Sequence, residues 1–378
     1  MIESQRHLFD TPDDVAFFNA GYMSPLPKAS AAAGEAALRR KSTPWVLTPE
    51  DFFTETNMFR SLAAQLIEAD TNDIAIIPSA SYGLAIAAKN IPLQSGAEIL
   101  VLTDQFPSNI YCWQRVALEK GAVIKTVPVP KNRDWTDAVL SAITNNTAVA
   151  ALPHNHWADG GLLDLIRIRE ALDTVGAKLV LDTTQSLGAM PLSVKKVRPD
   201  FLVAAAYKWL MCPYSTGFMY VAPEFQNGTP IEENWLNRKG SEDFAGLVNY
   251  QEDYQPGAIR FDMGERANFG LVPAAIASLQ QLLDWGVENI QETLKKRNSE
   301  IMNALSDTDI TAIPDQLRAG HFLGLEYEAG FPDDILGRLA AQKIYVSKRG
   351  NSLRITPHLY NNNQDFERLT EALKQILT

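Results

Sequence analysis

Two segments decide the fold: LVLDTTQSLGA at residues 179–189 and FLVAAAYKWL at residues 201–210. Each begins with a short apolar run of the kind found in strands that are buried on both faces of a parallel sheet. Ligands of such sheets bind beyond the carboxyl ends of the strands, which is where Asp182 and Lys208 stand. The chain between them leaves room for one helix or loop excursion, so we expect both side chains in one crevice.

Further apolar runs predict more strands of the same sheet, at Asp73–Pro78, Glu98–Thr103, Val123–Val129, Ala148–Leu152 and Gly217–Val221. Helical patterns stand between them, as at Tyr82–Lys89 and Asn109–Lys120. Strands that alternate with helices are typical of βαβ units. The sequence therefore predicts an α/β fold whose large domain holds a mostly parallel, seven-stranded sheet with helices on both faces.

The pattern changes after about Phe261. Long helices are predicted at Pro273–Trp285, Val287–Leu305 and Gln364–Leu377, and short strands at His321–Glu326 and Ser352–Thr356. We expect a large domain over residues 16–260, a smaller α+β C-terminal domain over residues 261–378, and an N-terminal segment, residues 1–15, that packs with the smaller domain. Residues 225–257 are polar and predict an irregular insertion near a site.

The composition limits the function classes. The 378 residues carry a formal net charge of −11, which argues against a nucleic-acid partner. Two cysteines, Cys112 and Cys212, cannot form a disulfide framework, so a cytoplasmic location is expected. No signal peptide and no membrane span are predicted. His154 and His156 have no cysteine or carboxylate at a ligand spacing, so no metal is expected.

Lys208 and Asp182 together suggest pyridoxal 5′-phosphate (PLP). Taken singly, a lysine after a strand is usually a solvated group and a strand-end aspartate a helix cap. Lys208, however, stands between AAAY and WLM, and an apolar setting lowers a lysine pKa, as a Schiff-base lysine requires. An ionised Asp182 can hold a pyridinium nitrogen protonated. The small residues Ser79–Ser81, which open a helix, predict a phosphate site.

Six segments then carry a family resemblance: IIPSASYGLA, LTDQFPSN, LPHNHWADGG, LVLDTTQS, AAAYKWL and SLRITPH, in this order. They resemble the class V aminotransferase family of fold type I PLP enzymes, with its cysteine desulfurases, selenocysteine lyases, cystine lyases, kynureninases and isopenicillin N epimerase-like members. The resemblance runs from Phe17 to Arg354. It implies an enzyme that acts on an amino acid, as a homodimer with shared active sites.

The resemblance also implies roles for individual residues. Lys208 would form the Schiff base and move the Cα proton, Asp182 would pair with the pyridine nitrogen, and Arg354 would bind the substrate carboxylate. Other cofactor contacts would come from Gln185 near the ring, Ala80, Ser81 and Tyr207 at the phosphate, Phe106 stacked on the ring where a desulfurase has a histidine, and Trp157 where desulfurases often place an asparagine.

Further residues are expected around the site. Asn19, Ala20 and Gly21 would line the substrate entrance, and His156 would border the substrate. The segment GERAN, residues 264–268, resembles a loop that family dimers donate to the phosphate site of the partner, which would make Arg266 or Asn268 a contact across the dimer.

The chain departs from the desulfurases because no cysteine follows Cys212, so no late cysteine can carry a persulfide. The expected reaction is β-elimination by a C–S lyase, with transamination and Cα epimerisation as alternatives. A non-catalytic binding protein would generally have lost the lysine or its aspartate, and both are present here.

Overall fold

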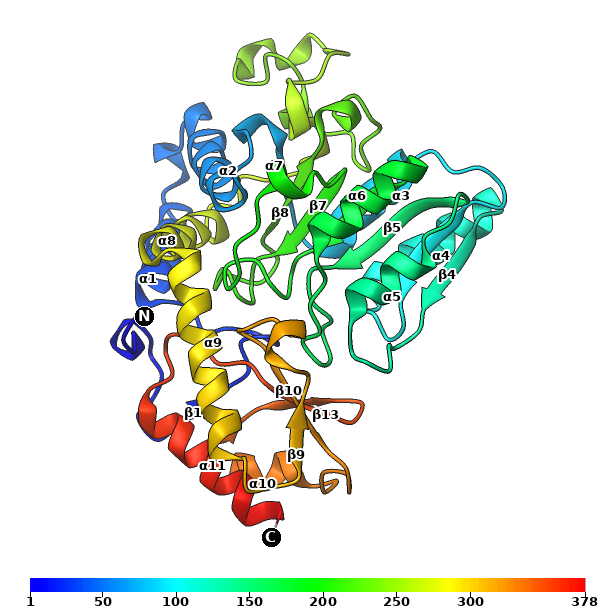
Figure 1. Ribbon diagram of the computed structural model, residues 1–378. Helices are drawn as coiled ribbons and strands as arrows, with labels where there is room; N and C mark the ends of the chain where they lie inside the picture. Colours follow the sequence, from blue (N-terminus) through cyan, green and yellow to red (C-terminus); the bar gives the residue numbers. More distant parts are fainter. Residues whose placement is uncertain (378) are drawn as a thin grey trace.

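The computed structural model describes residues 1–377 and contains a larger unit around a seven-stranded sheet and a smaller unit around a four-stranded sheet (Figure 1). The order in the larger sheet is β2-β8-β7-β6-β5-β3-β4, with only β8 antiparallel to its neighbours. The predicted α/β fold with a mostly parallel sheet is confirmed. Its strands are β2 (Ile74–Ile77), β3 (Glu98–Leu102), β4 (Val123–Val127), β5 (Thr147–Pro153), β6 (Lys178–Asp182), β7 (Phe201–Ala205) and β8 (Gly217–Val221).

Continuous apolar runs form these strands because both faces of the sheet are covered. In β2, Ile74 and Ile76 pack into one hydrophobic core, whereas Ala75 and Ile77 pack into the core on the opposite face. Helices α3 (Ala80–Asn90) and α4 (Ser108–Lys120) cover the second face. The first face is covered by α2 (Thr54–Ile67), α5 (Trp135–Ala142), α6 (Leu165–Val175), α7 (Val194–Val197) and α8 (Leu271–Trp285), with α1 (Lys28–Arg40) packed on α8.

Helix α3 lies unusually close to the sheet, and Gly83 makes this approach possible. A Cβ atom at Gly83 would stand 2.6 Å from Val203 Cγ1 and 2.9 Å from Ile77 Cδ1. Glycine at this position therefore sets how the first turn of α3 meets the ends of β2 and β7.

The smaller unit has an antiparallel sheet in the order β12-β13-β10-β9, and the two-residue strand β1 pairs with β11 beside it. Its core takes side chains from three helices. The elements are β1 (Ala16–Phe17), α9 (Val287–Ala304), β9 (Ile310–Ala312), β10 (Leu323–Tyr327), α10 (Ile335–Ala341), β11 (Ile344–Tyr345), β12 (Ser347–Arg349), β13 (Ser352–Ile355) and α11 (Asn363–Leu377).

Elements near the two predicted domain limits pack across them. Ala16 and Phe18 belong to the core of the smaller unit, whereas α8 packs against α1 and α2 of the larger one. Strand β1 has only two residues, which is too short for a recognisable sequence pattern. The apolar face of α8 would have the same sequence pattern whichever unit it packed against. The limits at residues 16 and 261 stay a prediction.

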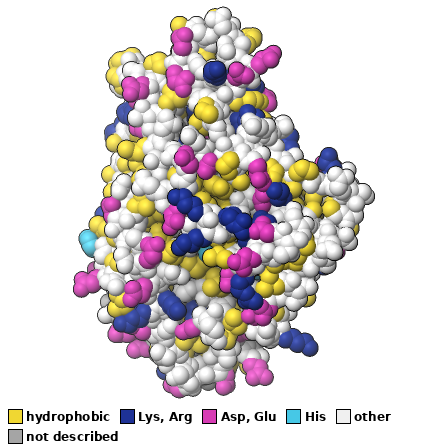
Figure 2. Space-filling model, turned by 45° about the horizontal axis from the view of Figure 1, so that its top comes forward, with side chains coloured by type: hydrophobic (Ala, Val, Ile, Leu, Met, Phe, Trp, Pro, Cys, Tyr) yellow, Lys and Arg dark blue, Asp and Glu magenta, His cyan; other side chains and the backbone are white. Residues whose placement is uncertain are grey.

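Residues 223–257 contain the short 3₁₀ turns η5 (Pro223–Phe225), η6 (Trp235–Asn237) and η7 (Phe244–Val248) and one isolated antiparallel bridge, Arg238 with Tyr254, and they project at the top of Figure 1. Acidic and basic side chains are interspersed over the face shown in Figure 2. Among residues 1–377, no helix is both long enough and apolar enough to cross a membrane.

Candidate active site

A cavity of about 210 Å³ lies at the carboxyl ends of the central strands, and it brings Asp182 and Lys208 together. Asp182 is the last residue of β6, and Lys208 follows the end of β7, the neighbouring parallel strand. The sequence-predicted residues that line the cavity are Ala80, Ser81, Phe106, Trp157, Asp182, Gln185, Tyr207 and Lys208.

Lys208 is a buried amine without a polar partner. Its side chain belongs to a residue that is 6% exposed, and Nζ makes no hydrogen bond or ion pair with residues 1–377. Nζ lies 5.2 Å from the centre of the Phe106 ring and 5.6 Å from that of Tyr207. Burial lowers the pKa of Lys208 to about 8, against the opposing charge of Asp182. The group is therefore suited to reaction as a neutral amine.

Asp182 is a buried carboxylate that accepts few hydrogen bonds from the protein. One oxygen accepts a hydrogen bond from Thr184 N at 3.0 Å. Burial raises the pKa of Asp182, while the Thr184 hydrogen bonds and the positive charge of Lys208 lower it. A cationic N–H group in the cavity would stabilise the ionised form, which is what a protonated pyridine nitrogen provides.

Ser79, Ala80 and Ser81 at the start of α3 form a site for an anion at the edge of the cavity, and we call this site the anion cup. Ser79 caps the helix by accepting a hydrogen bond from Tyr82 N at 3.2 Å, and its hydroxyl lies 2.9 Å from that of Ser81. The N–H groups of Ala80 and Ser81 have no acceptor inside the helix, as in any first turn. The Tyr82 hydroxyl donates to Glu232 at 2.7 Å and anchors this turn.

Two buried amides point to a ligand in the same cavity. Asn155 Oδ1 and Asn109 Nδ2 are buried, and neither has a hydrogen-bond partner among residues 1–377. Both residues line the cavity. Together with the amine of Lys208, the carboxylate of Asp182 and the anion cup, these unpaired atoms fit a ligand with an aldehyde, a ring nitrogen, a ring oxygen and a phosphate. The residues present therefore fit PLP.

Asn155 lines the cavity together with Trp157, and whether Trp157 takes the place of an asparagine beside the cofactor stays a prediction. Trp157 lines the cavity, but its indole N–H donates outward to the backbone oxygen of Asp104, and its ring packs edge-on against Phe106 at 5.4 Å. Asn155 stands two residues before Trp157 and was not predicted as a site residue. The sequence signal was its position just after β5, the same strand-end rule that identified Asp182 and Lys208.

His156 does not line the cavity, and its predicted contact with the substrate stays a prediction. The ring stacks on Trp135 at 5.0 Å, and Nε2 contacts the backbone oxygen of Thr103 at 3.0 Å. Nδ1 lies 3.3 Å from Asp159 Oδ1. Because consecutive residues in this turn point in different directions, Asn155 enters the cavity and His156 the core.

The segment Asn19–Gly21 lies next to the cavity and does not line it. Ala20 N and Gly21 N donate to the backbone oxygen and the hydroxyl of Thr356, at 3.0 and 3.1 Å. Gln185 lines the cavity, yet its amide donates to Gly21 O at 2.9 Å and accepts from Trp209 Nε1 at 3.2 Å. Gln185 therefore connects the cavity to the smaller unit, and its contact with the cofactor ring stays a prediction.

Arg354 lies against Trp157 at the side of the cavity. It donates to Ser347 Oγ at 2.8 Å and to the backbone oxygen of Trp157 at 2.9 Å. It has no acidic partner among residues 1–377, although it is 1% exposed. Burial and the charge of Arg349 lower the pKa of Arg354 to about 9. A buried guanidinium without a counter-ion suits the predicted binding of a carboxylate.

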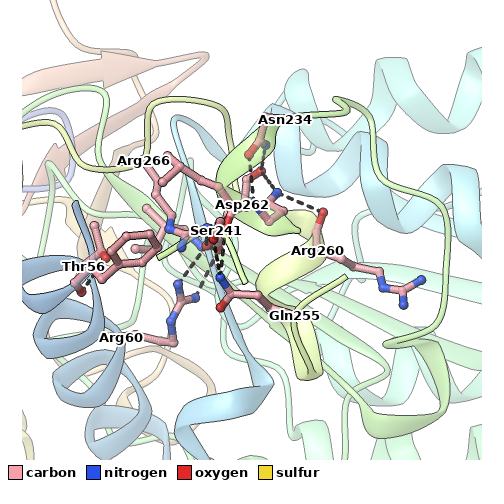
Figure 3. Close-up of polar contacts among 12 residues, drawn as sticks. Thr56, Arg60, Asn234, Ser241, Gln255, Arg260, Asp262 and Arg266 are labelled. Atoms are coloured by element: carbon pink, nitrogen blue, oxygen red, sulfur yellow. Dashed lines mark hydrogen bonds and ion pairs between the residues drawn. The ribbon is translucent and has the colours of Figure 1, made fainter. Parts of the chain in front are cut away.

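Arg266 is buried and binds residues of its own chain (Figure 3), and its predicted contact with a partner stays a prediction. It lies 3.1 Å from Asp262 Oδ2 and donates to Asn237 Oδ1 at 2.6 Å. Asn268 is exposed, and its side chain caps α8 by accepting from Leu271 N at 3.0 Å. A contact of Asn268 across a dimer stays a prediction.

Sequence reasoning missed the residues that shape the turn after β3. The Gln105 amide holds this turn through the backbone oxygens of Asn109 and Ala151, at 3.0 and 2.9 Å, and so positions Phe106. Asp104 adopts a left-handed conformation, with φ of 54°, which is rare outside glycine. The missed residues with polar side chains that line the cavity are Gln105, Ser108, Asn109, Asn155, Thr184, Tyr214 and Ser215.

The pKa of Lys208 predicts how the apoprotein captures PLP. Only the neutral amine attacks an aldehyde, so the rate constant should rise as the pH increases through about 8. In Asp182→Asn the midpoint should move to lower pH, because the negative charge of Asp182 favours the ammonium form. Stopped-flow absorbance after mixing apoprotein with PLP measures both. A midpoint near the ordinary lysine value of about 10.4 would contradict the prediction.

Comparisons with known proteins agree with this geometry. Residues 48–364 match the family model described as Aminotransferase class-V. The chain is similar to an uncharacterized aminotransferase, YcbU, of Bacillus subtilis, with 27% identity over 89% of this chain and 87% of the relative. It is also similar to the isopenicillin N epimerase of Amycolatopsis lactamdurans, with 23% identity over 96% and 95% of the two chains.

A solved structure supports the fold. The complex between the cystine C–S lyase C-DES and its reaction product cysteine persulfide matches with a TM-score of 0.87. The match covers 97% of this chain and 99% of the other at 18% sequence identity. At this identity the likeness shows the fold, which is that of the solved enzyme over nearly the whole chain.

Proposed function

Because the chain belongs to the aminotransferase class V family, whose members use PLP and act on amino acids, we propose that it is a C–S lyase. Its substrate would be a cysteine-derived amino acid, and its reaction a β-elimination without an enzyme-bound persulfide. The observation that carries the proposal is a cavity with one proton-transferring amine, Lys208, and no thiol among its lining residues. The sulfur would therefore be released as part of a product and would not be transferred to a cysteine of the enzyme.

The two cysteines support this reading. Cys212 is buried, and its thiol contacts the backbone oxygen of Leu210. Burial raises the pKa of Cys112 to about 12 and also raises the pKa of Cys212. Neither thiol is suited to act as a nucleophile, since thiolates are the reactive species. Both cysteines are free, in keeping with the proposed cytoplasmic location.

The cavity residues would have different roles in this reaction. Asp182 and the first turn of α3 would hold the ring nitrogen and phosphate of PLP, which supplies an aldehyde and a ring that withdraws electrons from the substrate Cα. Lys208 takes the Cα proton, and the electron pair of the broken Cβ–S bond leaves on sulfur. Because a thiol has a pKa of only about 8.5, the leaving group needs no strong acid. Phe106 offers none.

The reaction consumes a cysteine thioether and water and yields pyruvate, ammonia and a thiol, so it needs no oxidant. We expect the holoenzyme to release pyruvate and thiol in equal amounts from an S-substituted cysteine, measured with lactate dehydrogenase and a thiol reagent. Amino transfer to an oxo acid would instead identify an aminotransferase. Solvent deuterium at Cα with an inverted centre and no pyruvate would identify an epimerase.

We also propose that the protein forms a homodimer with shared active sites. Large apolar side chains are exposed at Trp45, Val248 and Tyr250, with Tyr250 95% exposed, and a partner subunit would cover such side chains. Asn268 is also exposed and available for a contact with a partner. Light scattering tests this, with an expected mass of twice 41.8 kDa.

A further inference from the structure

Two arginines converge on one indole ring beside the cavity. The guanidinium carbon of Arg349 lies 5.6 Å from the centre of the Trp157 ring, and that of Arg354 lies 5.7 Å from it. Neither arginine forms an ion pair with residues 1–377. Two other arginines do have acidic partners: Arg133 pairs with Glu326, and Arg318 pairs with Asp315. The positive charge around Trp157 is therefore uncompensated.

Strand register explains why both arginines point the same way. In the β12–β13 ladder, Ser347 stands opposite Arg354, and Arg349 stands opposite Ser352. Opposed residues and alternate residues of a strand share a face of the sheet. Ser347 Oγ accepts from Arg354, so Arg349 projects from the same face. Ser352 Oγ on this face is buried and has no partner among residues 1–377.

This face is close to the reacting amine. Trp157 lines the cavity, and the charges of both arginines lower the pKa of Lys208. Arg349 is half-buried and donates one N–H to its neighbour, Lys348 O, at 2.8 Å, which leaves its other donors available. An α-amino acid needs one guanidinium for its carboxylate, and Arg354 fills that role. The second cation is then left without a counter-ion.

We propose that Arg349 binds a second anionic group, carried on the side chain of the substrate, while Arg354 binds the α-carboxylate. The inference rests on the proposed function and specifies its substrate class as α-amino acids with an acidic side chain. A planar guanidinium can bind such a carboxylate through two hydrogen bonds.

The test uses two probes of nearly equal size that differ in charge, S-carboxymethyl-L-cysteine and S-carbamoylmethyl-L-cysteine. Each is mixed rapidly with the holoenzyme over a range of concentrations, and Kd is read from the visible bands of the cofactor before pyruvate forms. We expect the acid to bind at least about tenfold more tightly than the amide, since a hydrogen bond between two charged groups is stronger than one to a neutral amide. Arg349→Met should abolish the difference while leaving the Kd of the amide nearly unchanged.

Lys348→Met is the matched control, because Lys348 is the next residue on β12 and projects from the opposite face. It should retain the preference for the acid. Equal Kd values in the wild type, or a preference that survives Arg349→Met, would overturn the proposal. If the acid is preferred but neither probe releases pyruvate, the anion site stands and the lyase reaction fails. If both probes release pyruvate and bind equally, the lyase stands and the anion site fails.

Discussion

Replacing Lys208 with alanine is expected to lower turnover by at least about 10²–10⁴-fold, because no other amine in the cavity can move the Cα proton. PLP should still bind without a covalent link, since Asp182 and the first turn of α3 remain. Pyruvate release measures the first effect. The second is measured by the cofactor spectrum and by loss of PLP on gel filtration.

Lys195→Ala provides the control, because Lys195 is an exposed lysine on α7, away from the cavity. It should leave both turnover and the cofactor spectrum unchanged. Wild-type turnover in Lys208→Ala would mean that another group takes the proton. Complete loss of PLP binding would mean that Asp182 and the anion cup do not hold the cofactor on their own.

Replacing Asp262 with asparagine is expected to lower the free energy of unfolding by about 3–5 kcal/mol, because it leaves two buried guanidinium groups without their carboxylate. Arg60 meets Asp262 through two hydrogen bonds, at 2.8 and 3.1 Å, and Arg266 lies 3.1 Å away (Figure 3). All three residues are 1% exposed. Ile76 N also donates to Asp262, at 2.7 Å, so the network fixes β2, which leads into the anion cup. Urea unfolding measures the change.

Asp334→Asn is the comparison for the stability measurement. Asp334 pairs with Arg338 at 2.9 Å on the surface, with both side chains at least half exposed. Such pairs contribute about 0–1 kcal/mol, so this variant should stay close to the wild type. If Asp262→Asn were equally mild, the network in Figure 3 would not be the ion cluster that we describe.

The parts of the fold and site that were predictable depend on local patterns. An apolar run of about five residues marks a strand with both faces buried, and the polar residue at its end marks the ligand side of the sheet. Asp182, Lys208 and the Ser79–Ser81 turn all follow this rule, and the structure brings them together in one cavity.

The rest depends on contacts that a sequence pattern does not encode. Nothing near Arg266 in the chain indicates that Asn237, 29 residues earlier, binds it. Asn155 and His156 are neighbours in sequence, and only the path of the turn decides which of them enters the cavity. The register of β12 with β13 places Arg349 on the same face as Arg354, and the sequence pattern does not encode this register.

The most direct test of the central claim is to reduce the holoenzyme with borohydride, digest it, and locate the cofactor by mass spectrometry. The account predicts one modified peptide, with a pyridoxyl phosphate group on Lys208, the only lysine that lines the cavity within residues 1–377. A cofactor fixed to any other lysine, or no modified peptide from PLP-loaded protein, would contradict it.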